Sequence, residues 1–432
     1  MRTRREFLRM CAAMAGAVSL EAQQQNNYRA LVCVFQFGGH DGNNAIVPME
    51  NAAYAAYQRG RGALALAQRD LLAAGAQGKA YGFHPRLTGL RDLYLQKRVA
   101  VMANVGMLVK PVTREQYKIA ETALPRNLYS HSDQVQQWQS SNPSGGSATG
   151  WGGRIADSMP PADALIPPVI SVAGNSLLLV GLRNSPANLS PGNDFGLSYI
   201  GGSRGDTARL EALQQILQLD SGARLISAAQ NVLAAGMRNS QELRRALSGA
   251  PALKQEFPNS DLGNQLKQVA QLIASRTRLG AARQIFFCSQ GGYDNHSDLL
   301  PSHDNLLGAL GPAMAAFYRA TEELGVAAQV TTFTVSEFGR TFNASSTNGS
   351  DHAWGNHHLV MGGAVRGGEM YGEFPVQELR GPSDAGDRGV WIPTTSLDQY
   401  GAALAAWYGV GAPEMKQVFP NLGNFVAPPS VL

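Results

Sequence analysis

Three apolar runs of strand length constrain the fold most, because each of them leads directly into a polar loop. They lie at 30–37 (ALVCVFQF), at 283–290 (RQIFFCSQ) and in the first part of 328–340 (AQVTTFTVSEFGR). A continuous apolar run of this length is typical of a strand that is buried on both faces, as in a parallel sheet. The pattern therefore predicts buried parallel strands whose ends carry polar loops.

Helical patterns alternate with these runs. Further strands are expected at 98–105, 168–173, 177–181 and 359–365, and helices near 51–58, 306–324 and 397–409. Alternation of this kind implies right-handed crossovers and a mainly parallel sheet covered by helices on both faces. The sequence therefore predicts an α/β fold. Long amphipathic helices within 206–280 are expected to form a helical insertion between the two halves of that core.

The first 22 residues have the features of an export signal. Residues 2–9 are basic, and residues 10–20 are small and mostly apolar. Arg4 and Arg5, followed by Phe7 and Leu8, match the twin-arginine pattern R-R-x-F-L. We expect residues 1–22 to be a twin-arginine signal peptide, the translocon to be a partner during export, and the protein to be periplasmic or secreted. The alternative is an amphipathic first helix of the fold.

The charge balance of the remaining chain excludes some partners. The formal net charge is +4, and the four arginines and two glutamates of the first 22 residues account for +2 of it. The rest of the chain has no strongly basic patch, so nucleic acid is not expected as a partner. No apolar run of ~20 residues follows the N-terminus, so no membrane span is expected. Cys33 and Cys288 either form a disulfide in an oxidising compartment or lie as two buried thiols.

Polar side chains follow the predicted strands at the edge where ligands bind in open α/β sheets. Asp41 comes after the first strand, next to His40, and Asp294 and His296 come after the second. The third strand is followed by Glu337, Arg340, Asp351, His352, His357 and His358. Carboxylates and imidazoles that arrive from separate strand ends suit a divalent cation. Each residue alone also fits a turn or a simple hydrogen bond, so their joint occurrence predicts the metal site.

A further polar segment, YSHSDQVQQW at 129–138, is typical of a helix N-terminus. There the hydroxyl of Ser130, beside His131, would meet the positive end of the helix dipole, where an oxyanion can bind. Ser130 is therefore a candidate nucleophile activated by a metal. The alternative is that Ser130 or Ser132 only caps the helix. The sequence has no G-x-S-x-G elbow, no Walker loop and no C-x-x-C pair.

The motifs together resemble one family. They are FGGHDGNNAIVP, SHSDQ, GGYDNHSD, SEFGRT, DHAWGNHH followed by MGGAVRGG, and a late FPNL. From about residue 30 to the end, the chain is similar to the domain of unknown function 1501 family, which itself resembles a distant branch of the alkaline phosphatase and sulfatase superfamily. The resemblance implies a three-layer α/β/α sandwich over 28–432. It also implies one or two divalent metal ions, such as zinc, manganese or calcium.

The resemblance assigns roles to single residues. It implies that Asp41 is a metal ligand after the first strand and that Asp294 and His296 bind one metal. Ser130 falls where that superfamily has its serine or threonine nucleophile, with His131 beside it.

Two alignments stay open for the third strand. In the first, Glu337 replaces an aspartate ligand, Phe338 replaces a histidine, and His352 is the late ligand. In the second, Asp351 and His352 form the aspartate–histidine pair, and His357 or His358 is the late ligand.

These roles imply an exported, metal-dependent hydrolase of phosphate or sulfate esters, acting on a small molecule or a polymer. The metal would lower the pKa of Ser130 or of a water for in-line attack, and Arg340 or Arg114 would stabilise the charge on the non-bridging oxygens. Under the first alignment Phe338 removes a ligand. The alternative is therefore a catalytically degenerate binding or envelope-associated module on the same fold.

Overall fold

A nine-stranded sheet forms the centre of the computed structural model, which describes residues 28–432 apart from 77, 120–123, 161–163, 193–202 and 221. The expected signal peptide lies outside the described residues. The strand order is β11-β5-β10-β9-β1-β8-β6-β7, with β12 also paired to β5. The bounds are β1 Arg29–Gln36, β5 Val99–Gly106, β6 Val169–Ser171, β7 Ala187–Asn188, β8 Arg283–Gln290, β9 Val330–Val335, β10 Asn356–Gly362, β11 Met370–Tyr371 and β12 Thr395–Ser396.

Strand β1 lies near the middle of this sheet and contributes to two cores. It pairs in parallel with β8 on one side and with β9 on the other. Because successive side chains of a strand point to opposite faces, Val32 and Val34 enter one core and Cys33 and Phe35 the other. The thiols of Cys33 and Cys288 are free and lie in different cores, on opposite faces of the sheet.

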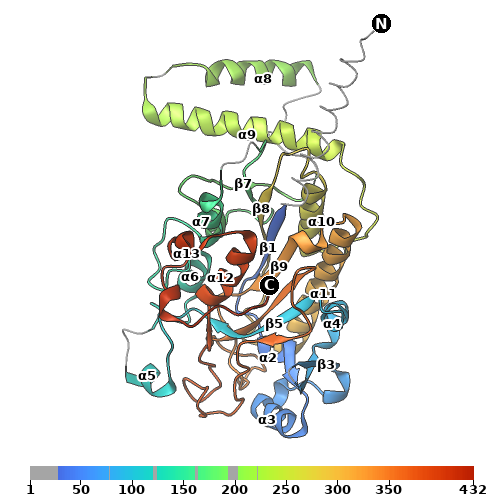
Figure 1. The fold of residues 1–432 in the computed structure, drawn as a ribbon, viewed down its shortest axis with the longest axis vertical. Coiled ribbons are helices and arrows are strands. Elements are labelled where there is room, and N and C mark those ends of the chain that lie inside the picture. The colour runs from blue at the N-terminus through green and yellow to red at the C-terminus, as the bar shows by residue number, and fades with distance from the viewer. Residues whose placement is uncertain (1–27, 77, 120–123, 161–163, 193–202, 221) are drawn as a thin grey trace, which may run out of the picture.

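Helices cover both faces of the sheet (Figure 1). One face is covered by α4 Thr88–Leu95, α10 Asp261–Ala274 and α11 Leu299–Glu323. The other is covered by α6 His131–Ser140, α7 Trp151–Ser158, α12 Leu397–Tyr408 and α13 Ala412–Val418. The predicted α/β class, with a mainly parallel sheet between two helical layers, is therefore confirmed. The exception to parallel pairing is β10, which runs antiparallel to both of its neighbours.

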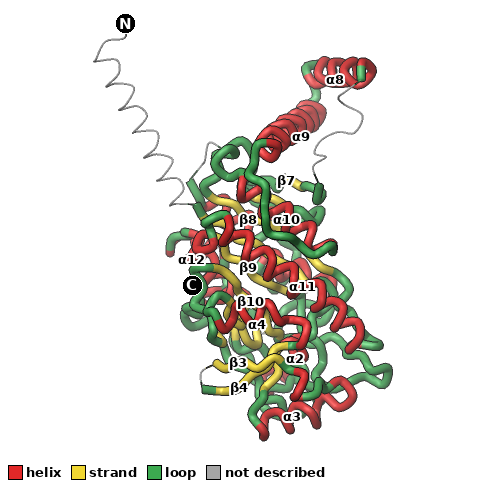
Figure 2. The backbone as a smooth tube through the Cα atoms, turned by 90° about the vertical axis from the view of Figure 1, so that its right-hand side faces the viewer, coloured by secondary structure: helices red, strands yellow, loops and turns green. Residues whose placement is uncertain are grey.

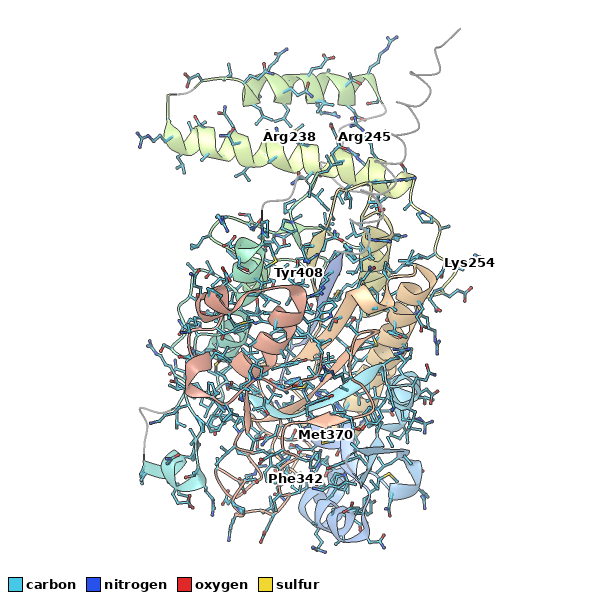
Figure 3. The ribbon with its side chains drawn as sticks, in the orientation of Figure 1. Arg238, Arg245, Lys254, Phe342, Met370 and Tyr408 are labelled. Atoms are coloured by element: carbon cyan, nitrogen blue, oxygen red, sulfur yellow. The ribbon has the colours of Figure 1, made fainter. Side chains whose placement is uncertain are left out.

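Two smaller units extend from this core. A three-stranded antiparallel sheet, β2 Ile46–Pro48, β4 Lys79–Phe83 and β3 Leu72–Ala76, packs beside α3 Asn51–Arg61. At the opposite end, α8 Arg204–Leu217 and α9 Arg224–Ser248 form a hairpin that stands away from the body (Figure 2). Within α9 only Leu243 and Ala246 are buried. Arg238 and Arg245, two other residues of this helix, are labelled in Figure 3.

One predicted element is wrong. Residues 177–181 do not form a strand: Leu177–Leu179 form a 3-10 turn. This turn places Leu178 and Leu179 against the core that contains Trp138 and Trp151, so burial explains the apolar run without a strand. In the part of the chain that the structure describes, no helix is long and apolar enough to cross a membrane.

Candidate metal centre

Asp294 lies at the centre of the polar cluster that forms where β1, β8 and β9 end. Its Oδ1 lies 2.9 Å from Nε2 of His296 and 3.2 Å from Nε2 of His352, and its Oδ2 lies 3.3 Å from Nε2 of His131. Ligand atoms of His131, Asp294 and His352 all lie within 4.8 Å of one another. His296 is outside that group of three, and its Nε2 lies 3.1 Å from Nε2 of His352.

The other ring nitrogen of each histidine faces a hydrogen-bond acceptor. Nδ1 of His131 lies 2.8 Å from Oε1 of Glu337. Nδ1 of His296 lies 3.1 Å from Oδ1 of Asp351, and Nδ1 of His352 lies 2.8 Å from the carbonyl oxygen of Tyr129. Since a carboxylate and a carbonyl only accept, each Nδ1 can donate a hydrogen to its partner. With the hydrogen on Nδ1, the Nε2 lone pair of each ring would point toward Asp294 and be free to bind a metal ion.

This donor set fits a divalent metal ion. Imidazole nitrogens with one carboxylate oxygen are the ligands of tetrahedral zinc sites. A histidine that binds a metal almost always donates its second ring N–H to a carboxylate or a backbone carbonyl, and all three Nδ1 atoms here face such an acceptor. The Nε2 atoms of His296 and His352 lie 3.1 Å apart, so both could bind the same cation when each ring has its hydrogen on Nδ1.

Local sequence explains how His131 and His352 reach the cluster. Ser130 is the N-cap of α6, and its hydroxyl accepts from the backbone N–H of Asp133, which makes His131 the first residue of the helix. Tyr129, just before the cap, has a φ of +74°, and its carbonyl oxygen holds Nδ1 of His352. The helix start thus supplies one histidine and orients another.

Gly38 lets the loops after β1 and β8 approach each other. Its φ is +115°, and a Cβ at this position would lie 2.4 Å from the backbone nitrogen of Asp294. Only glycine tolerates both conditions. The Gly38 N–H donates to Oε1 of Glu337 at 2.7 Å, so the same residue also orients the carboxylate behind His131.

Two guanidinium groups set the charge of the cluster. Nη1 of the buried Arg340 donates to Oδ1 of Asp294 at 2.7 Å, and Arg388 forms an ion pair with Asp351. Partial burial raises the pKa of Asp294, but Arg340, together with His296 and His131, more than offsets this, and the net pKa lies below its ordinary value. The pKa of Asp351 is lowered in the same way, because Arg388 and His296 together outweigh the effect of burial.

The histidines differ in their proton affinity. The hydrogen bond to Glu337 raises the pKa of His131 above its ordinary value. Burial lowers the pKa of His352. Without a metal, His131 therefore binds a proton more tightly than His352 does. A metal ion that binds His131 would have to displace that proton.

The structure brings together most of the residues that the sequence indicated. Asp294, His296, His352 and His131 face one another, with Glu337, Asp351 and Arg340 in contact with them. Three other predicted residues, Asp41, His357 and His358, take other positions, and Ser130 lies directly before His131 as the cap of α6.

Asp41 is buried and paired with Arg61 at the end of α3. Its Oδ2 accepts from Nη2 of Arg61 at 2.5 Å, and both side chains are almost fully buried. A carboxylate that is neutralised in this way serves the packing of α3 against the loop after β1. Among the described residues, the group whose ligand atoms meet does not include Asp41.

Ser130 acts as a helix cap, and its hydroxyl also donates to Oδ2 of Asp133 at 2.6 Å. His358 lies in the core, where its ring is parallel to that of Tyr400 and edge-on to Trp138. His357 is buried too, and its Nδ1 accepts from the backbone N–H of Asn104 at 3.0 Å. Both histidines belong to strand β10, which explains their burial.

Sequence reasoning missed Arg61, Tyr129 and Arg388. Arg61 ends a helix whose pattern gave no sign of a buried cation, and Arg388 lies in an irregular segment rich in glycine and aspartate. Tyr129 acts through its backbone carbonyl, which any residue type supplies. None of the three positions carries a sequence signal that identifies its role.

Comparisons with known proteins place the chain in a family of uncharacterised function. The family model described as "Protein of unknown function (DUF1501)" matches residues 28–380. No curated protein matches the chain.

Solved structures resemble the chain only distantly. One is the C-terminal periplasmic domain of EcEptC from Escherichia coli in complex with Zn, with 8% identity, a TM-score of 0.37, and coverage of 78% of this chain and 74% of that one. Another is the PsFucS1 sulfatase from Pseudoalteromonas sp., with 9% identity, a TM-score of 0.36, and coverage of 95% and 72%.

Proposed function

The chain belongs to the DUF1501 family, and we propose that it is a metal-dependent hydrolase of phosphate or sulfate esters. The observation that carries the proposal is the convergence of three imidazole Nε2 atoms on Asp294, each with its Nδ1 facing an acceptor. This arrangement supports one divalent ion, held by His131, His296, His352 and Asp294. Zinc suits these ligands best, because three nitrogens and one oxygen match its usual set.

A bound divalent ion would polarise an ester oxygen and make an attacking hydroxyl or water more acidic. The role of the carboxylates Glu337 and Asp351 is to fix the ring orientation of His131 and His296 and to raise their basicity.

The charges around the cluster favour an anionic substrate. Three carboxylates, Asp294, Asp351 and Glu337, face two guanidiniums, Arg340 and Arg388, which leaves one net negative charge. A divalent cation reverses that sign. The loaded site would therefore attract the oxyanion of a phosphate or sulfate ester, and Arg388, at the partly exposed edge, would bind its non-bridging oxygens.

Ser130 is our candidate for the attacking group. Its hydroxyl is partly exposed, it precedes the ligand His131, and it donates to the carboxylate of Asp133 at 2.6 Å, which is the contact of a nucleophile with a base. A water is the alternative nucleophile. We further propose that the protein acts in the periplasm or outside the cell after twin-arginine export, supported by the arginine pair and apolar run of residues 1–22.

A non-catalytic role is the second candidate. The Ser130 hydroxyl is already engaged as a helix cap, which favours a site that binds a metal and an anion without turnover. Both candidate functions require a bound metal ion, but only the first predicts hydrolysis of an ester.

The test combines metal content with turnover. Signal-free protein, purified without chelators, is assayed for metal by elemental mass spectrometry and for hydrolysis of 4-nitrophenyl phosphate, bis(4-nitrophenyl) phosphate and 4-nitrophenyl sulfate. The proposal predicts about one equivalent of metal per chain, and loss of both metal and turnover in Asp294→Ala. Asp304→Ala, which removes an aspartate paired with Arg86 outside the site, is the matched control and should keep both.

Other outcomes separate the alternatives. Ser130→Ala should abolish turnover and keep the metal if the hydroxyl attacks, and should keep turnover if a water does. Metal without turnover on any ester supports the binding module. Wild-type protein that binds none of zinc, manganese and calcium, or an Asp294→Ala variant that keeps its metal, refutes the site.

A further inference from the structure

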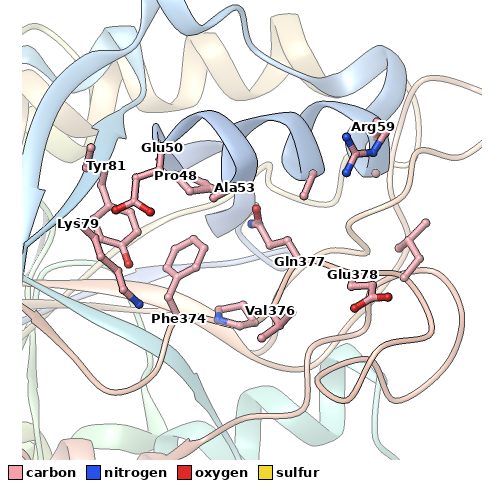
Figure 4. Close-up of a pocket in the computed structure, with 15 residues that line it drawn as sticks. Pro48, Glu50, Ala53, Arg59, Lys79, Tyr81, Phe374, Val376, Gln377 and Glu378 are labelled. Atoms are coloured by element: carbon pink, nitrogen blue, oxygen red, sulfur yellow. The ribbon is translucent and has the colours of Figure 1, made fainter.

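A cleft of about 620 Å³ lies apart from the metal centre, between α3, strand β4 and the segment 374–379 (Figure 4). None of its lining residues belongs to the metal cluster. Its volume is in the range of small-molecule binding sites. Besides alanine, proline, valine and leucine side chains, its lining contains a buried amide, two aromatic rings and four charged groups.

The amide of Gln377 is the least expected feature of this cleft. The side chain is only 9% exposed, and within the described residues neither its Nε2 nor its Oε1 has a hydrogen-bond partner. Figure 4 shows it pointing across the cleft toward α3. Buried amides are nearly always hydrogen-bonded, because an unpaired one costs about 1–3 kcal/mol. Gln377 therefore offers both a donor and an acceptor to whatever occupies the cleft.

Two aromatic rings form an apolar wall next to this amide. Tyr81 on β4 and Phe374 have ring centroids 5.3 Å apart. Tyr81 is largely buried, and Phe374 is half-buried and held from behind by the parallel ring of His357 at 4.6 Å. An aromatic surface that is fixed in this way suits a ligand with a flat apolar face.

The charged side chains balance one another. Glu50 and Lys79 lie toward one end of the cleft, and Arg59 and Glu378 toward the other (Figure 4). In the part of the chain that the structure describes, none of the four forms a salt bridge. Two positive and two negative groups give no net charge, so the cleft does not favour a phosphate, a nucleic acid or an anionic lipid. It suits a neutral ligand with many polar groups.

We propose that this cleft binds a neutral oligosaccharide. Sugar hydroxyls both donate and accept, which matches the two unpaired atoms of Gln377 and the carboxylates and cations at the two ends. The C–H face of a sugar ring is apolar and would pack on Phe374 and Tyr81. The inference is independent of the proposed hydrolysis.

A peptide is the less suitable occupant. A common way for an extended peptide to bind is to add a strand to a free sheet edge. Edge strand β2 contributes only Pro48, which has no backbone N–H to donate, and the other strand residues at this wall belong to β4, the central strand of its sheet. Its backbone groups are therefore engaged, and the cleft offers side chains rather than a strand edge.

The test is a calorimetric titration of signal-free protein, with a chelator present so that the metal centre plays no part. The probes are cellohexaose, chitohexaose and maltohexaose, with hexa-alanine as the peptide comparison. We expect at least one hexasaccharide to bind and Gln377→Ala to weaken it about tenfold, equivalent to about 1.4 kcal/mol. Because the amide has no partner, this variant should keep its melting temperature.

Two further variants complete the design. Gln377→Met keeps the side-chain volume and should weaken binding by a similar factor. Gln58→Ala, which removes an exposed amide of α3 that does not line the cleft, should bind like wild type. The proposal is overturned if no hexasaccharide binds, if both Gln377 variants bind like wild type, or if hexa-alanine binds instead.

Discussion

Replacing Arg61 by methionine should destabilise the protein strongly without affecting the metal centre. Arg61 is fully buried and donates four hydrogen bonds, to Asp41, Asn44 and the carbonyl oxygens of Thr341 and Phe342. These contacts join the end of α3 to the loop after β1 and to the segment after β9. Methionine fills similar space but leaves the carboxylate of Asp41 buried without its cation.

The expected loss is about 3–5 kcal/mol of unfolding free energy. Removing one partner of a buried ion pair costs this much, because the remaining charge is uncompensated. The three bonds to neutral acceptors are part of the same loss, since their carbonyl and amide oxygens are buried as well. Asp41→Asn should cost less, because the amide oxygen still accepts from Arg61. The double variant should recover part of the loss, because no charge is then left unpaired.

The loss in unfolding free energy is measured by urea unfolding followed by circular dichroism. It is read from the shift of the unfolding midpoint, provided that the slope of free energy against urea concentration is unchanged. Arg69→Met is the matched control: its pair with Asp70 is exposed, at 87% and 58%, and should contribute less than about 1 kcal/mol. Elemental analysis should find the same metal content in Asp41→Asn as in wild type. A loss below about 1 kcal/mol in Arg61→Met, or loss of the metal from Asp41→Asn, would contradict our reasoning.

Three further outcomes follow from the geometry. Burial lowers the pKa of His84 and of His357 to about 4 from 6.5, so below pH 6.5 the unfolded chain binds protons that the folded chain does not. The unfolding free energy should fall by up to about 3 kcal/mol for each of these histidines as the pH falls from 6.5 to 4. His357→Gln should therefore make the urea midpoint depend less on pH. Asp351→Asn should weaken zinc 10–100-fold, roughly, in competition with a fluorescent chelator; unchanged affinity would remove its supporting role. Gly38→Ala, whose Cβ would meet the backbone of Asp294, should lower both the urea midpoint and zinc affinity, and a variant like wild type would contradict the close approach.

The sequence predicted which polar residues after the strands would lie close together. Parallel strands β9, β1 and β8 are neighbours, so the loops after them meet at one edge of the sheet. Asp294 and His296 follow β8 directly, and His352 lies in the loop after β9. Their meeting depends on strand order and direction alone, which apolar runs indicate well.

The prediction for His357 and His358 depended on where one strand begins. The sequence suggested a strand from residue 359, which left both histidines in a polar loop and available as ligands. In the structure β10 begins at Asn356, so both are strand residues on buried faces. An apolar run gives a strand's centre more reliably than its ends. A shift of three residues therefore moved two candidate ligands into the core.

Asp41 shows a different limit of sequence reasoning. An aspartate after a buried strand occupies the edge where ligands bind, but its side chain can also turn toward a neighbouring helix. Which of these occurs was decided by Arg61, 20 positions later, at the end of α3. The helix pattern alone gives no reason to bury that arginine.

The sequence could not distinguish the carboxylate that faces the Nε2 atoms from the carboxylates that hold the Nδ1 atoms. Glu337 and Asp351 have the same chemistry as Asp294 and lie in the same loops, but each faces an Nδ1 atom rather than the three Nε2 atoms. Residue type cannot distinguish these positions, because a carboxylate serves either one. The third support, the carbonyl oxygen of Tyr129, has no side-chain signature at all. With Glu337 and Asp351 used as supports, one carboxylate remains to bind a cation, which is why the geometry favours one metal ion over two.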